Sequence, residues 1–443
     1  MKKKALLAAA ALAALMVPQI AGAEGFGIVE WSPEGVAMGG ARMFADNDAA
    51  SIASNPANLT KVSGQILKTG VTYISPHGKH DTKANPVLAP FGSVDESSQN
   101  RVHPGYAPGT YYAKKMSDKD FFGFGVYSRF GMVSGRQPGT MAASNNLYAK
   151  MNGLTIAPTY AHKFNKKWSA AVGLDINYVG LEMNQEVTQA VRAKKFLSLT
   201  PAEKYYFAHT PGGMEAFNKN IPGASTHLKG ESWALGWNAA VNYTFDDKNE
   251  MGVVYRSKIK HSLEADFNVY TPAGNGYGDA YGVVTLPDQW TIGYGHKFDD
   301  KHRVELNATR TNWHTYDALN IMVGGTRMLD GMHANPKNYG DSWRYAIGYE
   351  YKISKKYTLM AGFAWDQDSK PEDGGDFIVP VGTRRTYSIG ARYNDDKHAI
   401  ALALGYQKIG DFSFVGHESD AYSSAHNHGN YAKIVSVGYE YHF

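Results

Sequence analysis

The sequence predicts an all-β fold, a transmembrane β-barrel of about fourteen antiparallel strands. Apolar and polar residues alternate with a period of two along most of the chain after residue 64, as they do in strands that separate two environments. Very short connections between these segments take turns with long ones. The chain also ends on an alternating segment whose last residue, Phe443, is aromatic. Together the three observations favour a barrel in the outer membrane of a Gram-negative bacterium.

The first 23 residues have the order of a secretory signal peptide. Lys2, Lys3 and Lys4 precede an apolar run over 5–17, and small residues at 21–23 suit cleavage after Ala23. The run is shorter than the roughly 20 apolar residues that a spanning helix needs. We therefore expect an exported chain, with segment 1–23 as its signal peptide.

Charge and cysteine usage exclude several classes of function. The formal net charge is +4, and three of these charges belong to the predicted leader, so the mature chain is nearly neutral. Nucleic acid is therefore not an expected partner. The chain has no cysteine, which excludes a disulfide framework and thiol chemistry. We expect no cofactor.

Period-two alternation marks the expected strands. They are Gln65–Ser75, Tyr106–Met116, Phe121–Phe130, Leu154–Phe164, Trp168–Leu181, Ser232–Phe245, Glu250–Asn268, Gln289–Phe298, Arg303–Trp313, Trp343–Ile353, Tyr357–Trp365, Tyr387–Tyr393, His398–Ile409 and Lys433–Phe443. In Ser232–Phe245 one face carries Trp233, Leu235 and Trp237, which suit lipid, and the other carries small and amide side chains, which suit a lumen.

The connections strengthen the barrel interpretation. The short ones are 117–120, 165–167, 246–249, 299–302, 354–356 and 394–397, and the long ones are 76–105, 131–153, 182–231, 269–288, 314–342, 366–386 and 410–432. Outer-membrane barrels have short periplasmic turns and long outer loops. A soluble periplasmic sandwich, the alternative, has no reason to keep all its long loops at one end. Segment 182–231 is partly helical in composition, with Pro201 after Thr200 at a helix start.

The last strand carries a further signal. Tyr439, Tyr441 and Phe443 share one face at the end of the chain, and a terminal aromatic on such a strand resembles the assembly signal of outer-membrane barrels. We therefore expect the barrel-assembly machinery, membrane lipid and lipopolysaccharide as partners. Closure requires this strand to pair with the first one, because an open edge is not tolerated in lipid. We expect a monomer.

The stretch Gly35–Thr60 reads GVAMGGARMFADNDAASIASNPANLT and includes Asn55, Pro56 and Ala57. It resembles the N-terminal hatch, or plug, of FadL-type outer-membrane transporters of long-chain fatty acids and aromatic hydrocarbons. The stretch GVYSRFGMVSG over 125–135 is similar to the family's third strand and the start of its second outer loop. The resemblance implies a hatch over 24–63 inside a barrel over 64–443.

The resemblance also implies a function. Hydrophobic ligands would collect among the outer loops, enter a pocket against the hatch and leave sideways through the barrel wall into the membrane. A water-filled pore would offer such ligands nothing, because apolar surface is disfavoured in water. The expected function is transport of hydrophobic small molecules, with fatty acids first and aromatic hydrocarbons as the alternative. A general porin and a structural or adhesive barrel remain further alternatives, and we expect no enzymatic activity.

Two sets of residues are candidates for ligand contact. As in the family, the start of the hatch, with Phe26, Ile28 and Trp31, would reach the ligand pocket, although these side chains could instead only pack the plug. Asn55 and Pro56 are expected to hold the shape of the hatch rather than to touch ligand. A fatty-acid carboxylate could bind a lumen cation through paired hydrogen bonds. The candidates on predicted inward faces are Arg129, Arg256, Lys258, Arg303, Arg344 and Arg392, with Glu305 and Glu350 as competing partners.

Metal and catalytic sites are not expected. His417, His426 and His428 share the last outer loop and could bind a metal. Their spacing matches no familiar metal motif, and exposed loop histidines are commoner than metal ligands. The acidic residues Asp366, Asp368, Glu372, Asp373 and Asp376 do not have the spacing of an EF-hand and are interpreted as a solvated loop. No nucleophile elbow, phosphate loop or zinc-protease helix is present in the sequence, and nothing near His261 or His398 marks either as catalytic.

Overall fold

The structure is a computed structural model that describes residues 26–99, 104–272, 274–316, 318–326, 330–369, 376–379, 382–418 and 420–443. The expected signal peptide lies outside the described residues. Across the described ranges, no helix combines the length and the apolar character that crossing a membrane requires.

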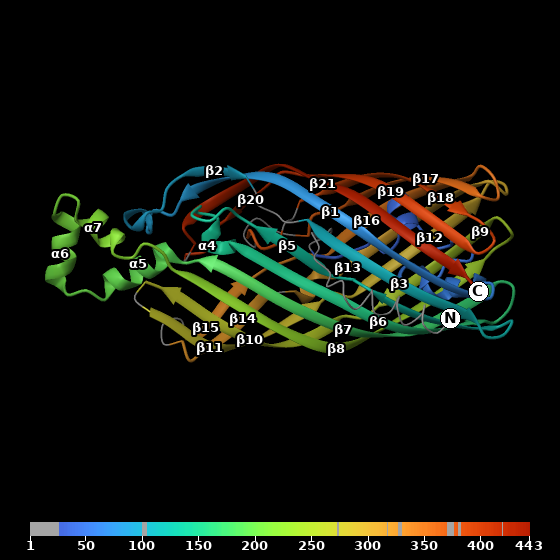
Figure 1. Cartoon of the computed structure of the whole chain (residues 1–443), viewed down its shortest axis with the longest axis horizontal. Helices are drawn as coiled ribbons and strands as arrows, with labels where there is room; N and C mark the ends of the chain where they lie inside the picture. Colours follow the sequence, from blue (N-terminus) through green and yellow to red (C-terminus); the bar gives the residue numbers. More distant parts are fainter. Residues whose placement is uncertain are drawn as a thin grey trace.

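The strands form one closed antiparallel barrel (Figure 1). It closes where β1 (Gln65–Ala84) pairs with β21 (Tyr422–His442), with Tyr73 opposite Val435. The other strands are β2 (Glu96–Gln99), β3 (Gly105–Lys115), β4 (Asp120–Tyr127), β5 (Gly131–Gly135), β6 (Tyr148–Lys163), β7 (Trp168–Glu186), β8 (Ser225–Thr244), β9 (Asn249–Arg256), β10 (Ile259–Thr271), β11 (Gly274–Leu286), β12 (Gln289–Lys297), β13 (His302–Thr311), β14 (Ala318–Gly324), β15 (Gly331–Pro336), β16 (Ser342–Lys352), β17 (Tyr357–Asp366), β18 (Arg384–Asn394), β19 (His398–Ile409) and β20 (Phe412–Val415).

Several of these segments are two halves of one interrupted wall strand. Such pairs are β4 and β5, β9 and β10, β11 and β12, β13 and β14, β15 and β16, and β19 and β20. The short β2 adds to the outer part of β1, with His80 opposite Ser98. Counted in this way the wall has 14 strands, and the predicted barrel is confirmed.

Short turns close one end of the barrel and helices extend the other. At Asp246 the carboxylate accepts backbone hydrogen bonds from Lys248 and Asn249, both at 2.8 Å, and the side-chain amide of Asn249 lowers the pKa of Asp246 further. At the opposite end, α5 (Thr188–Leu197), α6 (Pro201–His209) and α7 (Gly213–Lys219) project beyond the strands (Figure 1). Thr200 and Glu203 form a capping box that starts α6.

The two faces of the wall differ as the alternation indicates. Trp233, Leu235 and Trp237 on β8 are 58%, 67% and 51% exposed, whereas Asn238 and Asn242 on the other face are buried in the lumen. The ring of Trp237 lies 5.0 Å from that of Tyr255, which lies 4.6 Å from Trp290. Aromatic neighbours of this kind form the girdles of membrane barrels.

The strands extend further outward than the alternation suggests. β1 continues to Ala84 and β7 to Glu186, and the predicted long connection 269–288 contains β11. The connection 314–342 contains β14 and β15. The outer half of the wall buries an apolar inward face while also exposing Tyr277 and Tyr281 on the outward face, so simple alternation fades there.

The segment from Phe26 to Ser63 fills the lumen near the end of the barrel at which the C-terminus lies (Figure 1). Its helices are α2 (Pro33–Ala37), α3 (Ser51–Ser54) and the 3-10 helix η1 (Pro56–Lys61). The helix α2 contacts β17, β18, β19 and β21, whereas η1 contacts β6, β7 and β8. Contacts with opposite sides of one cylinder place this segment, called the hatch below, inside the bore.

Candidate functional site

The hatch is held against the wall by close backbone approach. Ser32 caps α2 by accepting a hydrogen bond from the Gly35 N–H at 3.0 Å, and Pro33 occupies the first helical position. Gly39 follows with a φ of 61°, and a Cβ atom there would lie 3.0 Å from the backbone of Phe363. Only glycine adopts this conformation without strain and leaves this space, so the turn seats the hatch directly on β17.

Asn55, Pro56 and Ala57 join the hatch to two wall strands. The Asn55 amide donates to the Met43 carbonyl at 3.1 Å and to Asn242 Oδ1 on β8 at 2.8 Å. Pro56 starts η1, and the Ala57 carbonyl accepts a bond from the Ser169 hydroxyl on β7 at 3.3 Å. These bonds determine the position of the hatch, which is the role expected for Asn55 and Pro56.

A chain of buried ion pairs holds the hatch in place. The Lys68 ammonium on β1 lies 2.9 Å from Glu34, 2.8 Å from Asp48 and 3.5 Å from Glu440. Arg42 lies 3.1 Å from Asp48, which extends the chain within the hatch. Further pairs continue it across the lumen, namely Arg42 with Glu350, Arg303 with Glu350 and Glu305, Arg392 with Glu34 and Glu440, and Lys61 with Glu250. Pairing offsets the desolvation that burial imposes on each charge.

A buried apolar cluster, called the chamber below, lies on the outer side of the hatch. Phe26 is fully buried, and its ring contacts those of Trp313 at 4.8 Å, Tyr316 at 5.1 Å and Phe130 at 6.0 Å in edge-on geometry. These rings belong to one cluster with inward side chains of the outer wall, including Met132, Met151, Leu181, Leu228, Ile259, Leu263, Phe267 and Val284. Side chains of this kind suit contact with an apolar ligand.

Arg129 lies at the edge of the chamber and is only partly satisfied. It is 2% exposed, its Nη1 donates to Asp175 at 2.9 Å, and its guanidinium lies 5.2 Å from the Phe130 ring. Within the described part of the chain, its Nε and Nη2 have no hydrogen-bond partner, and neither does Trp313 Nε1. Buried donors without acceptors are costly, so these two side chains present unused hydrogen-bonding capacity beside an apolar space.

The other cations proposed from the sequence are bound to the hatch or to the wall. Arg256 donates to the Tyr127 hydroxyl at 3.0 Å and to the carbonyls of Ile52 and Ala53. Arg303 donates to the Phe44 carbonyl at 2.6 Å besides its ion pairs. Arg344 donates to Asp366 at 2.6 Å and to the Gly39 carbonyl at 2.7 Å. Lys258 is exposed, so the inward face predicted for it is wrong.

The three hatch residues proposed from the sequence lie in different surroundings. Phe26 belongs to the chamber, whereas Ile28 packs in a separate apolar cluster with residues such as Val36 and Met360. Trp31 donates from Nε1 to the Ser128 carbonyl at 3.0 Å, with the Arg256 guanidinium 5.7 Å from its ring. A cavity of about 40 Å³ borders Trp31, Arg256 and Arg344. The structure thus brings Phe26 and Arg129 together at the chamber and leaves Ile28, Arg303 and Arg344 outside it.

Sequence reasoning missed three residues of this site. Asp175, the partner of Arg129, occupies an inward position of β7, where a lone acid among small and apolar residues was the available signal. Trp313 and Tyr316 were missed because η3 (Trp313–Thr315) interrupts the wall where a continuous strand followed by a loop was expected. A strand places alternate residues on alternate faces, and this 3-10 turn does not.

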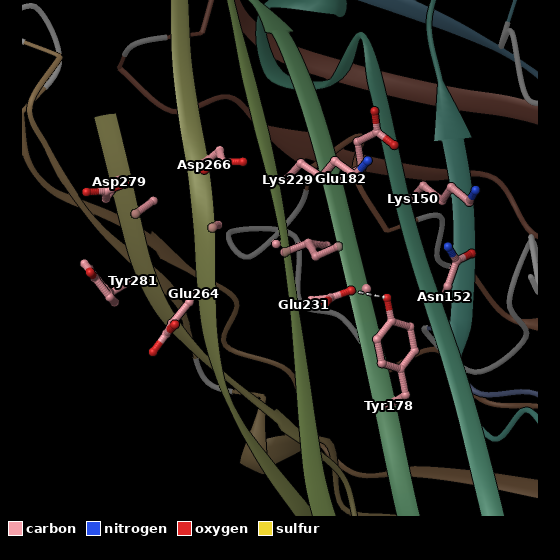
Figure 2. Close-up of a pocket in the computed structure, with 15 residues that line it drawn as sticks. Lys150, Asn152, Tyr178, Glu182, Lys229, Glu231, Glu264, Asp266, Asp279 and Tyr281 are labelled. Carbon is pink, nitrogen blue, oxygen red and sulfur yellow. Dashed lines mark hydrogen bonds between the residues drawn. The ribbon is translucent and has the colours of Figure 1, made fainter. Parts of the chain in front are cut away.

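A second concavity lies on the outward surface of the barrel, separate from the chamber. This groove of about 500 Å³ spans β6, β7, β8, β10 and β11. Figure 2 shows Lys150, Glu182, Lys229, Glu264 and Asp266 projecting from these adjacent strands. The Tyr178 hydroxyl donates to Glu231 at 2.8 Å. Because the residues on alternate positions belong to the chamber, the wall is apolar inside and charged outside at this height.

The loop residues considered for metal are dispersed. His428 lies 3.4 Å from Asp81, and His426 contacts the Ser413 hydroxyl at 2.9 Å. No group of three acidic or histidine side chains in the described ranges could hold a metal ion. Glu372 and Asp373 lie outside those ranges. Asp366 and Asp376 are each 1% exposed, so for these two the expected solvated loop is wrong, because each is paired, with Arg344 and Lys337.

The end of the chain lies on the lipid-facing surface. Tyr439 is 42% and Phe443 39% exposed, and the Phe443 N–H donates to the Gln65 carbonyl of β1 at 3.1 Å. The last strand therefore completes the closure and displays its aromatic face outward, and its role as an assembly signal stays a prediction.

Comparison with known proteins agrees with this architecture. The solved structure of a Pseudomonas aeruginosa FadL homologue superposes with a TM-score of 0.79 at 18% identity, covering 95% of this chain and 100% of that one. The Pseudomonas putida toluene transporter TodX gives a TM-score of 0.69 at 18% identity, covering 95% and 99%. The long-chain fatty acid transport protein of Escherichia coli O6:H1 is 23% identical over 458 residues, 98% of each chain.

The family model described as Outer membrane protein transport protein (OMPP1/FadL/TodX) matches residues 14–443. The match spans the hatch, the chamber and every wall strand. The chain therefore belongs to this family of outer-membrane transport proteins of Gram-negative bacteria.

Proposed function

We propose that this chain carries long-chain fatty acids across the outer membrane, holding the alkyl chain in the chamber around Phe26 and Trp313 and the carboxylate at Arg129. The observation that carries the proposal is the free edge of Arg129, whose Nε and Nη2 are buried without an acceptor among the described residues. A carboxylate binds such an edge through two parallel hydrogen bonds. Trp313 Nε1 offers a third donor.

Aromatic hydrocarbons are the second candidate, favoured by one observation. The rings of Phe26, Phe130, Trp313 and Tyr316 meet edge-on and would accept another ring between them. A neutral hydrocarbon, however, would leave the donors of Arg129 and Trp313 unpaired in a dry space. That cost favours the acid over the hydrocarbon.

The route of release is also a proposal. In the described residues β5 pairs with β6 alone, while β3 pairs with β4 only as far as Tyr127. The hatch occupies the inner side of this interruption, where the Ile28 N–H donates to the Arg129 carbonyl and the Gly131 N–H donates to the Phe26 carbonyl, each at 2.8 Å. Release of these bonds would open the wall beside the chamber, so an apolar ligand would leave into lipid without crossing water.

The test compares two buried arginine–aspartate pairs. The double variant Arg129→Gln with Asp175→Asn keeps a neutral hydrogen-bonded pair. It also removes the carboxylate 3.9 Å from Arg256, whose guanidinium keeps its hydrogen bonds to Tyr127, Ile52 and Ala53. Its matched control is Arg344→Gln with Asp366→Asn, a pair bound to the hatch rather than to the chamber. Binding of oleate and of toluene is measured on purified protein by isothermal titration calorimetry.

The first double variant is expected to lose oleate affinity by about tenfold to a hundredfold, since hydrogen bonds to charged groups are worth about 1.5–3 kcal/mol. The control is expected to keep it. Equal oleate affinity in both variants contradicts the role of Arg129. Binding of toluene but not oleate by the wild type would select the hydrocarbon.

A further inference from the structure

The barrel wall has an interruption at η3 that the proposed release route does not use. The ladder between β11 and β14 runs from Asp279 to Val283, which pairs with Asn320. The ladder resumes at Gln289, which faces Thr311 across β12 and β13. Between these points η3 replaces the strand, and the described residues form no ladder. At the inner edge of the break the Asn312 N–H donates to the Asp288 carbonyl at 3.0 Å.

At this point the wall consists only of the single 3-10 turn η3. Trp313 and Tyr316 face inward, are buried, and lie 4.8 Å and 5.1 Å from the ring of Phe26. Thr315, two residues from Trp313, lines a groove on the outward surface. The same short turn therefore touches the ligand chamber on one side and the exterior on the other.

The outward groove is apolar and has a volume of about 530 Å³. Tyr281, Val283, Met322 and Met332 line it and are 58%, 42%, 45% and 59% exposed. It lies on the outer side of the aromatic neighbours Trp290 and Tyr255, because β12 runs from the break past Trp290 towards its periplasmic turn. Clustered apolar side chains beyond a girdle mark a surface for an apolar ligand rather than for bulk lipid.

A second interruption nearby shows what a closed break looks like. Between β8 and β10 the ladder stops at Glu231 and Glu264, but the Ser257 N–H donates to the Trp237 carbonyl and the Trp237 N–H donates to the Ser257 hydroxyl, both at 2.9 Å. Ile259 fills the space over Gly236, where a Cβ would lie 2.7 Å from its side chain. The break at η3 has a comparable backbone bond, from Asn312 to Asp288, and differs in the groove that lies outside it.

We infer that η3 is a side portal, through which the alkyl chain of a fatty acid passes from the outward groove into the chamber when Trp313 swings aside. We assign an alkyl chain to the outward groove because the groove and the chamber are both apolar and are separated only by η3. Glu264 and Tyr281 line both grooves, so the charged groove, which also carries Lys150 and Lys229, adjoins the portal (Figure 2). This inference rests on the proposed function.

The absence of cysteine from the chain allows a disulfide test. Val283→Cys with Asn320→Cys staples β11 to β14 at the edge of the break, because the two residues face each other on the outward surface. The matched control, Asn268→Cys with Tyr277→Cys, staples β10 to β11, where the ladder is complete and neither residue lines the groove. Oleate uptake is measured in cells that have no other route, with and without a reductant.

The stapled portal is expected to slow oleate uptake several-fold, with recovery on reduction, while the control staple leaves the rate unchanged. As a second variant that needs no disulfide, Met322→Asp is expected to slow uptake, and Tyr277→Asp, outside the groove on the same wall, is expected not to. Unchanged uptake in the stapled portal and in Met322→Asp overturns the portal.

Equilibrium binding separates this inference from the proposed function. The stapled protein is expected to bind oleate with wild-type affinity after long incubation, because the chamber is intact. If the wild type itself neither binds oleate nor takes it up, the proposed function fails. If the wild type does both and the staple changes neither rate nor affinity, only the portal fails.

Discussion

The hatch and the chamber lie side by side in one lumen, but they bury side chains of opposite kinds. The hatch buries many charges, and its ion pairs link it to four wall strands through Lys68, Glu350, Arg392 and Glu250. The chamber buries apolar side chains and leaves Nε and Nη2 of Arg129 and Nε1 of Trp313 without protein acceptors in the described chain. The difference indicates that the hatch is built to hold its place, whereas the chamber is built to be completed by a ligand.

The largest expected effect concerns the hatch. Lys68→Ala removes the cation shared by Glu34, Asp48 and Glu440 and leaves these three buried carboxylates with only Arg392 and Arg42 as cations. The free energy of unfolding should fall by about 3–5 kcal/mol, measured by denaturant titration of the barrel in lipid vesicles. A loss below that of a typical surface variant would mean that the hatch is not held by these pairs.

The chamber should respond in binding as well as in stability. Phe26→Ala removes three edge-on ring contacts and with them an apolar surface whose burial against an alkyl chain is worth about 1.5–3 kcal/mol. Oleate affinity should fall by at least about tenfold, since every 1.4 kcal/mol is a factor of ten. Ile28→Ala, in the separate cluster, is the control and should bind oleate normally. An equal loss of oleate affinity in both variants would show that the cluster around Phe26 has no special role in binding.

The last strand tests whether closure depends on the terminal ring. Phe443→Ala keeps the backbone bond to Gln65 but removes an exposed aromatic side chain. We expect a lower yield of folded barrel in the outer membrane, read from the heat-modifiable band on gels, with unchanged oleate affinity of the fraction that folds. A full yield would remove Phe443 from the proposed assembly signal.

The smallest effect is expected at an exposed ion pair. Lys83 and Asp95 lie 2.8 Å apart near the outer end of β1, with side chains 71% and 58% exposed. Lys83→Ala should therefore leave the free energy of unfolding close to that of the wild type. An effect as large as that of Lys68→Ala would show that burial does not explain the strength of the hatch pairs.

The sequence predicts the wall well and its contents poorly, for physical reasons. On β8 the alternation of Trp233, Leu235 and Trp237 with small residues is imposed by lipid outside and by a crowded lumen inside, so local pattern is sufficient. Arg42 pairs with Glu350, far away in sequence, and periodicity carries no information about such a contact. The interruptions at 128–130 and 312–316 depend on packing against the hatch and chamber, which a local pattern does not record.

The site shows the same division. Phe26 and Arg129 could be proposed as ligand contacts from the sequence, Phe26 through resemblance to a family and Arg129 through its predicted inward position. From the sequence alone, Arg129 and Arg344 are equal candidates for binding a carboxylate, and only their partners in the structure distinguish them. Arg344 is bound to Asp366 and to Gly39 of the hatch, whereas Arg129 keeps one edge free.

The central claim is that the chamber binds the fatty acid with its carboxylate on Arg129. A crystal structure with a fatty acid brominated at the terminal carbon tests it most directly, because the anomalous signal locates the chain end. The account predicts bromine among the side chains around Phe26 and Trp313, with carboxylate density on Nε and Nη2 of Arg129. Bromine found only outside the chamber, or a carboxylate bound elsewhere with that edge of Arg129 empty, would contradict it.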